Sequence, residues 1–180
     1  ILICYGTTEG QTRKVCDFVA DIVRRAGHEP ALFDATGVSE LEASRCDAAI
    51  LAGSVHLGRY QSALVPRIRQ WHETLNAMPS VFPSVSLAAA SDDPHERSEA
   101  DEIAQKMLQD THWTPKGTLH VAGACRFTQY DFFKRWAMRL VARQRGETVD
   151  THADTEYTDW DDVTRFVEAF LRDLPAGQGT

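Results

Sequence analysis

The stretch GTTEGQT (6–12) carries hydroxyl groups and glycines at a spacing suited to anion binding. It follows an apolar run and precedes a segment with a helical pattern. If the stretch is the turn between a strand and a helix, the unpaired backbone N–H groups of the helix point at a ligand, and the helix dipole favours a negative charge there. Thr7, Thr8 and Thr12 add hydroxyls, and Gly10 lets the backbone approach a ligand closely. The stretch therefore predicts a phosphate-binding loop.

The loop has no lysine or arginine before Arg13, which restricts the kind of phosphate it can hold. A nucleoside triphosphate with Mg²⁺ requires the lysine of the GxxxxGK(S/T) motif, and the GxGxxG fingerprint of dinucleotide sites is also missing. A terminal monophosphate can be bound by backbone donors and hydroxyls alone. The alternative is a threonine-rich helix cap that binds nothing, although three hydroxyls in one turn exceed what capping requires.

Two further loops are expected beside the phosphate loop, because ligands of doubly wound sheets bind outside the carboxyl ends of the strands. GSVHLGRYQS (53–62) follows one apolar run, and AAASDDPHERS (88–98) follows the next. The first loop carries His56, Leu57 and Tyr60, which suit packing on a flat ring, and the second carries small residues that suit main-chain contact with a ring edge. Taken singly, such residues are more often plain surface. The candidate ligand-binding residues of the three loops are Thr7, Thr8, Gly10, Gln11, Thr12, Ser54, Val55, His56, Leu57, Gly58, Tyr60, Ala89, Ala90, Ser91 and Asp92.

Five short apolar runs, rich in β-branched residues, are separated by helical or turn-like segments. Continuous rather than alternating apolar runs are typical of strands buried on both faces of a parallel sheet. The expected strands cover residues 1–5, 29–33, 47–55, 80–90 and 118–124. The expected helices cover residues 10–26, 60–76, 94–111 and 158–174. The pattern predicts an α/β fold in which helices cover both faces of a five-stranded parallel sheet.

Residues at the helix ends support these bounds. Gly27 and Pro175 follow two of the expected helices, and Pro94 opens a third. The last helix is expected to open at Thr158, where the sequence TDWD (158–161) resembles a capping box with Asp in place of Glu. The interval between the second and third strands holds at most a short helix.

Length and composition indicate one soluble domain. We expect residues 1–175 to form it, with 176–180 as a frayed tail. Hydrophobic residues make up 43% and charged residues 25%, and no apolar stretch approaches the ~20 residues of a membrane span. The net charge of −7 disfavours general nucleic-acid binding. The four cysteines have no CxxC pairing and no metal-like spacing to the histidines, so we expect reduced core thiols and no metal site.

One interval is longer than the rest. After the fifth expected strand, about thirty residues (126–156) precede the last helix, and loops of this length are usually functional or disordered. The first 21 residues of this insert have a net charge of +5, although the chain as a whole has −7. Arg135, Arg139 and Arg143 recur at helical spacing beside apolar residues such as Trp136. The insert therefore predicts a basic amphipathic helix.

A basic amphipathic helix suits an anionic membrane surface, where each Lys or Arg contributes about 1 kcal/mol. The alternatives are an ordinary helix that covers the sheet with a solvated charged face, or pairing with the acidic segment 147–162. The candidate substrate or membrane contacts are Arg59, Arg126, Arg135, Trp136, Arg139 and Arg143.

The loop TTEGQT resembles the flavodoxin pattern T-x-T-G-x-T, with Glu9 where a third phosphate-binding threonine is usual. More specifically, the chain resembles the bacterial quinone-dependent protoporphyrinogen IX dehydrogenase family, flavodoxin-like FMN proteins that perform a late oxidation in haem synthesis. That family also has an acidic residue at the position of Glu9, whose carboxylate we expect to face solvent, and a basic insert after the fifth strand. The matching stretches run through nearly the whole chain: TTEGQTR (7–13), GRYQSA (58–63), LNAMPSVFPSV (75–85), VAGACRF (121–127), GETVDT (146–151) and YTDW (157–160).

The resemblance implies FMN, with its phosphate surrounded by Thr7, Thr8, Gly10, Gln11 and Thr12. Flavin N5 accepts a hydride, so no catalytic acid–base residue is needed and none is assigned. The implied reaction oxidises protoporphyrinogen IX and passes electrons to a quinone. The expected location is cytoplasmic and peripheral on the inner membrane, with self-association as a further expectation.

Two other functions are compatible with the same residues. One is a flavodoxin-like electron carrier or general FMN quinone reductase. The other is a flavin-free α/β module that uses the phosphate loop to bind a partner or a phosphorylated metabolite.

Overall fold

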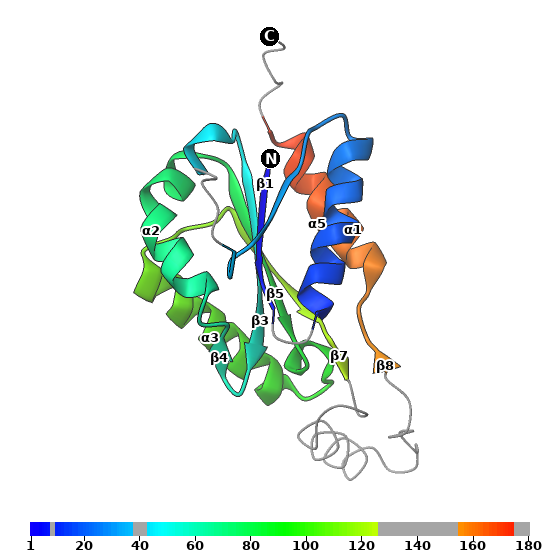
Figure 1. Cartoon of the computed structure of the whole chain (residues 1–180). Coiled ribbons are helices and arrows are strands. Elements are labelled where there is room, and N and C mark those ends of the chain that lie inside the picture. The colour runs from blue at the N-terminus through cyan, green and yellow to red at the C-terminus, as the bar shows by residue number, and fades with distance from the viewer. Residues whose placement is uncertain (8–9, 38–42, 126–154, 175–180) are drawn as a thin grey trace.

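The structure is a computed structural model that describes residues 1–7, 10–37, 43–125 and 155–174. Five parallel strands form the centre of the molecule in the order β2-β1-β3-β5-β6 (Figure 1). Their bounds are β1 Leu2–Gly6, β2 Ala31–Asp34, β3 Ala49–His56, β5 Ser80–Ser86 and β6 Gly117–Ala122. This arrangement confirms the predicted five-stranded parallel sheet.

A short strand that was not predicted extends the sheet beside β3. β4 (Arg59–Tyr60) pairs antiparallel with β3, so that Val55 lies opposite Tyr60 and His56 lies opposite Arg59. The chain therefore reverses in a tight hairpin where a longer open loop was expected.

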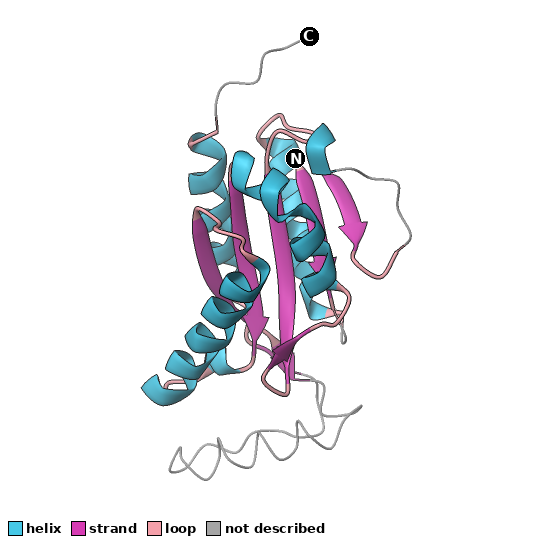
Figure 2. Cartoon of the chain, turned by 90° about the vertical axis from the view of Figure 1, so that its left-hand side faces the viewer, coloured by secondary structure: helices cyan, strands magenta, loops and turns pink. Residues whose placement is uncertain are grey.

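Helices cover both faces of the sheet, as predicted (Figures 1 and 2). Side chains of β1 alternate between two cores because successive strand residues point to opposite faces. Ile3 packs in the core that contains residues of α1 and α5, and Leu2 packs in the core that contains residues of α2 and α3. The helices are α1 Gln11–Arg25, α2 Leu64–Ala77, α3 Pro94–Thr111 and α5 Trp160–Arg172.

The fourth predicted strand is shorter than expected. β5 ends at Ser86, and Ala88–Ala90 form the short 3-10 helix η2. Three successive alanines lack the β-branched or aromatic side chains that favour a strand, so the apolar run continues beyond the end of the sheet. A second 3-10 helix, η1 (Ala43–Arg45), lies before β3, in agreement with the short helix allowed there.

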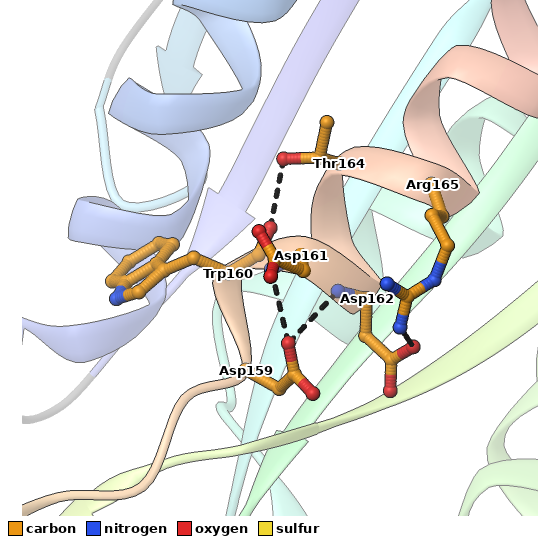
Figure 3. Close-up of polar contacts among 6 residues, drawn as sticks. All are labelled: Asp159, Trp160, Asp161, Asp162, Thr164 and Arg165. Carbon is orange, nitrogen blue, oxygen red and sulfur yellow. Dashed lines mark hydrogen bonds and ion pairs between the residues drawn. The ribbon is translucent and has the colours of Figure 1, made fainter.

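The predicted capping box at Thr158 is wrong by one residue (Figure 3). Asp159 is the N-cap of α5, because its Oδ1 accepts hydrogen bonds from the backbone N–H groups of Asp161 and Asp162, both at 3.0 Å. The Thr158 hydroxyl is used elsewhere: it donates to the carbonyl oxygen of Ala122 at 2.7 Å. The threonine thus fastens the chain before α5 to the end of β6.

A two-stranded ribbon joins the two ends of the long insert. β7 (Ala124–Cys125) and β8 (Thr155–Glu156) pair antiparallel, below the carboxyl end of the main sheet in Figure 1. The insert predicted over 126–156 therefore begins and ends at neighbouring points, and its predicted basic helix lies outside the described residues.

Cys4, Cys16 and Cys46 are free thiols. Cys4 and Cys16 are fully buried, and burial raises the pKa of the Cys4 thiol to about 12. Within the described part of the chain, no helix is long and apolar enough to cross a membrane.

Candidate functional site

A cavity of about 350 Å³ lies at the carboxyl end of the sheet, where the sequence predicted a ligand. Its walls come from the start of α1, the end of β3 with the β3–β4 hairpin, the segment after β5, one face of α3, and the residues just after β6. Eight predicted site residues line it: Thr7, Gln11, Thr12, Ser54, Val55, His56, Leu57 and Gly58. The fold therefore brings the phosphate loop and the hairpin to one space.

The turn before α1 leaves the helix start open to the cavity. Gly10 is the N-cap with φ 85°, a left-handed conformation that glycine adopts without strain, and no side chain caps the helix. The hydroxyl of Thr7 instead accepts a hydrogen bond from the backbone N–H of Gly10 at 2.9 Å, which closes the turn. Since no side chain of residues 1–7, 10–37, 43–125 or 155–174 caps this helix start, its first N–H groups can receive an anion.

Thr12 has a buried polar side chain at the cavity that a bound ligand could satisfy. It is completely buried and lines the cavity, and its Oγ1 has no hydrogen-bond partner among the described residues. An unpaired buried hydroxyl costs about 1–3 kcal/mol, so native proteins rarely keep one without a purpose. A phosphate oxygen at the start of α1 would satisfy it.

The cations of the first turn of α1 are engaged outside the cavity. Lys14 Nζ pairs with Glu156 on β8 and lies 5.3 Å from the centroid of the Trp160 ring. Arg13 Nε lies 3.8 Å from a carboxylate oxygen of Asp17. No lysine or arginine is among the described residues that line the cavity. Backbone N–H groups and hydroxyls are therefore the groups available to an anion there.

Gln11 lines the cavity, and its side chain also links the start of α1 to the residues before α5. Its Nε2 donates to Thr158 Oγ1 at 2.9 Å, and that hydroxyl in turn donates to Ala122 at the end of β6. Only 8% of Gln11 is exposed. The amide is therefore tied to the neighbouring edge of the site, which fixes the first residue of α1.

Leu57 and Gly58 form the two-residue turn of the β3–β4 hairpin. Their φ angles are 50° and 74°, the combination that tight hairpins require and that Asn-Gly adopts most easily. A leucine in the left-handed region is rare and costs roughly 1–2 kcal/mol. Leu57 is also 70% exposed at the cavity wall, so strain holds an apolar side chain beside the ligand space.

Tyr60 does not line the cavity, which corrects its predicted place on a ring face. It is 8% exposed in the core beneath α2 and α3, where its ring centroid lies 5.3 Å from that of Phe82. Its hydroxyl is hydrogen bonded to Ser84 Oγ at 2.7 Å, and burial raises the pKa of Tyr60 to about 12. Residue 60 faces inward because it pairs with Val55 across the hairpin, whereas Arg59 is exposed.

The loop after β5 reaches the cavity with different residues from those predicted. Ser86, Leu87 and Ala88 line it, because the strand ends at Ser86 and η2 turns the chain away. Ala89 and Ala90 line a separate cavity of about 300 Å³ beside β6. Of the other two predicted residues, Ser91 is buried, with its Oγ accepting from the backbone N–H of Asp93, and Asp92 is exposed.

Several cavity residues were not predicted. Glu96, Glu99 and Ile103 belong to one face of α3, which is visible in the sequence as spacings of three and four residues. Gly123 and Ala124 follow β6, so the rule that ligands meet the carboxyl ends of strands would have found them. Among the predicted residues, Thr8, Arg126, Arg135, Trp136, Arg139 and Arg143 lie outside the described part of the chain. Within that part, no group of three or more His, Cys, Asp or Glu side chains could hold a metal ion.

Comparison with known proteins identifies the family. The sequence matches the family described as flavodoxin domain over residues 2–152. A protein of Escherichia coli strain K12 named protoporphyrinogen IX dehydrogenase (quinone) is 30% identical over 177 residues, covering 97% of each chain. The chain belongs to this flavodoxin-like family.

One further relative and one solved structure are similar to this chain. A Leishmania major protein, also named protoporphyrinogen IX dehydrogenase (quinone), is 28% identical over 173 residues, covering 94% of this chain and 73% of the relative. The crystal structure of oxidised flavodoxin 1 from Bacillus cereus superposes with a TM-score of 0.57 at 15% identity, covering 97% of this chain and 98% of that chain. The second comparison shows the fold alone, and the flavodoxin-domain match together with the Escherichia coli relative confirms the predicted family.

Thr12→Val tests whether the buried hydroxyl is reserved for a ligand. The substitution is expected to leave the free energy of unfolding unchanged or to raise it by up to about 1 kcal/mol, because it removes an unpaired polar group. Urea unfolding measures the effect. Inorganic phosphate should raise the melting temperature of the wild type more than that of the variant.

The matched control is Thr111→Val. Thr111 is equally buried, but its hydroxyl donates to the carbonyl oxygen of Met107 at 2.8 Å, so its loss should lower stability by about 1 kcal/mol. Equal destabilisation by the two substitutions would mean that the Thr12 hydroxyl has a partner within the fold.

Leu57→Asn should raise the free energy of unfolding by about 1 kcal/mol, because asparagine tolerates positive φ in a hairpin turn. Chemical denaturation measures the change. The control is Leu32→Asn, which replaces another exposed leucine, in strand β2, and should give no gain because asparagine disfavours strands. A loss of stability at position 57 would show that the leucine packs within the fold.

Proposed function

We propose that this chain is an FMN-dependent oxidoreductase that converts protoporphyrinogen IX to protoporphyrin IX and passes the electrons to a quinone. The observation that carries the proposal is the completely buried hydroxyl of Thr12, which has no hydrogen-bond partner among the described residues and lies at a helix start inside the cavity. The relatives named protoporphyrinogen IX dehydrogenase (quinone) supply the reaction.

The residues of the cavity fit the phosphate of FMN. The first N–H groups of α1 and the Thr12 hydroxyl would hold the phosphate, and no cationic side chain is required for a monophosphate in the positive end of a helix dipole. A cavity of about 350 Å³ is within the usual range for small-molecule sites.

The flat end of the ligand has two suitable walls. The hairpin residues His56 and Leu57 form one wall, and Leu87 and Ala88 form another. When bound, the flavin supplies the hydride acceptor, so the chain itself needs to bind, orient and partly desolvate the reactants. The apolar side chains of the walls exclude water, and the hairpin fixes the side from which a substrate can approach.

The long insert is proposed to bind the membrane surface or the carboxylates of the substrate. The β7–β8 ribbon stands at the two ends of the insert, and Ala124 of that ribbon lines the cavity. The insert therefore begins at the edge of the site. Arg126, Arg135, Trp136, Arg139 and Arg143 belong to this insert by sequence. Cationic and aromatic side chains suit an anionic headgroup layer, which gives a peripheral protein on the cytoplasmic side of the inner membrane.

Anaerobic mixing tests the reaction directly. Purified protein loaded with FMN should lose its yellow colour when protoporphyrinogen IX is added, and a quinone should restore the colour with formation of protoporphyrin IX. Both steps are followed by visible absorption and porphyrin fluorescence. A flavin that is bleached by a reductase but not by the porphyrinogen would indicate an electron carrier instead. A protein unable to take up FMN would indicate a flavin-free module.

Vesicle binding tests the role of the insert. Replacing Arg135, Arg139 and Arg143 by Gln should weaken binding to anionic vesicles by roughly 100-fold at low salt, from about 1 kcal/mol per charge near the surface. The control is the triple change of Arg24, Arg25 and Arg172 to Gln, which removes the same charge from exposed residues at the other end of α1 and α5. Equal losses in the two triple variants, or none, would remove the membrane role.

A further inference from the structure

Gln61 contacts the phosphate loop although it lies in another part of the chain. It follows β4 directly, and its side-chain Nε2 donates to the carbonyl oxygen of Thr7 at 2.7 Å, a contact between residues 54 positions apart. Gln61 is half-buried and is not part of the cavity lining. We infer that Gln61 is a positioning residue for the phosphate of the cofactor, an inference that rests on the proposed function.

The contact decides which polar groups of Thr7 face the ligand. Thr7 lines the cavity, and its hydroxyl already accepts from the N–H of Gly10. Its carbonyl oxygen carries a partial negative charge, which would repel a phosphate if it faced the cavity. Because Gln61 lies outside the lining, its hydrogen bond holds this carbonyl toward the body of the protein. The positive end of α1 then meets the anion without an opposing dipole.

Close packing fixes the backbone position from which the Gln61 side chain reaches Thr7. A Cβ placed on Gly6 would lie 3.2 Å from the Cβ of Gln61 and 2.8 Å from the Cβ of Leu64, so only a glycine at the end of β1 allows this approach. The carbonyl oxygen of Gln61 also accepts from the N–H of Leu64 at 3.1 Å, which joins it to the first residue of α2. Both main chain and side chain of Gln61 are therefore held.

Residues 57–61 connect the two ends of the cavity. Gln61 comes next to Tyr60, which is anchored in the core by its hydrogen bond with Ser84. Leu57, in the turn of the hairpin, lies four residues before Gln61 in the chain. A single stretch of residues thus links the wall proposed for the flat ring to the loop proposed for the phosphate, and it sets the spacing between them.

Comparing FMN with riboflavin separates this role from general support of the fold, because riboflavin has the same ring and lacks the phosphate. In Gln61→Leu, which removes the donor at similar size, the dissociation constant of FMN should rise about tenfold, as expected for one lost hydrogen bond that orients the loop. The dissociation constant of riboflavin should change less than about twofold. Quenching of flavin fluorescence on titration gives both constants.

A second variant covers the case in which Gln61→Leu fails to fold. Gln61→Glu keeps the size but places a carboxylate against the Thr7 carbonyl, so FMN affinity should fall more than in Gln61→Leu, with the excess loss shrinking as salt is added. Gln105→Leu, at an exposed position of α3, is the matched control and should leave both affinities unchanged.

The outcomes distinguish this inference from the proposed function. Equal losses for FMN and riboflavin, or no loss for either, would overturn the positioning role of Gln61 while leaving FMN as the cofactor. Wild-type protein that binds neither FMN nor inorganic phosphate would overturn both.

Discussion

The start of α1 is the constraint on which the site depends. The helix leaves the end of β1 with no side-chain cap, and the buried Thr12 hydroxyl beside it has no partner in the described chain. Both features are unfavourable in an empty protein and favourable around an anion. Since β1, β3 and β5 are parallel strands of one sheet, the segments that follow β3 and β5 begin at the same edge of the sheet as this helix start. The other walls of the cavity therefore lie around the start of α1.

The absence of a cation from the described lining of the cavity follows from contacts at its edges. Lys14 is held by Glu156 and Trp160, and Arg13 lies beside Asp17, so both charges of the first turn are balanced away from the ligand. Neutral donors fix the loop instead. Gln61 restrains it from the hairpin side, while Gln11 ties the helix start to the residues before α5. Both contacts attach described residues of the turn before α1 to other parts of the fold, while the helix dipole supplies positive charge at the helix start.

The long insert is connected to this site through the same contacts. Glu156 belongs to β8, the strand that closes the insert, and it pairs with Lys14 on the helix that begins at the cavity. Thr158, two residues further on, links Gln11 to the end of β6. A chain of side-chain contacts therefore runs from the start of α1 to β8, the strand that ends the long insert. The start of α1 and the β8 end of the insert are therefore joined by direct side-chain contacts.

The sequence alone determined the sheet and its helices, because apolar periodicity and helix-end residues report local burial and local backbone conformation. It placed Thr7, Thr12 and the loop after β3 at one edge of the sheet through the general rule for parallel sheets. Only the tertiary structure decided that Tyr60 points into the core and that η2 removes Ala89 and Ala90 from the cavity. It also decided the contacts of Gln61 with Thr7 and of Gln11 with Thr158, which join residues 54 and 147 positions apart. Such partners depend on strand register and on close packing at Gly6, and neither leaves a periodic trace in the sequence.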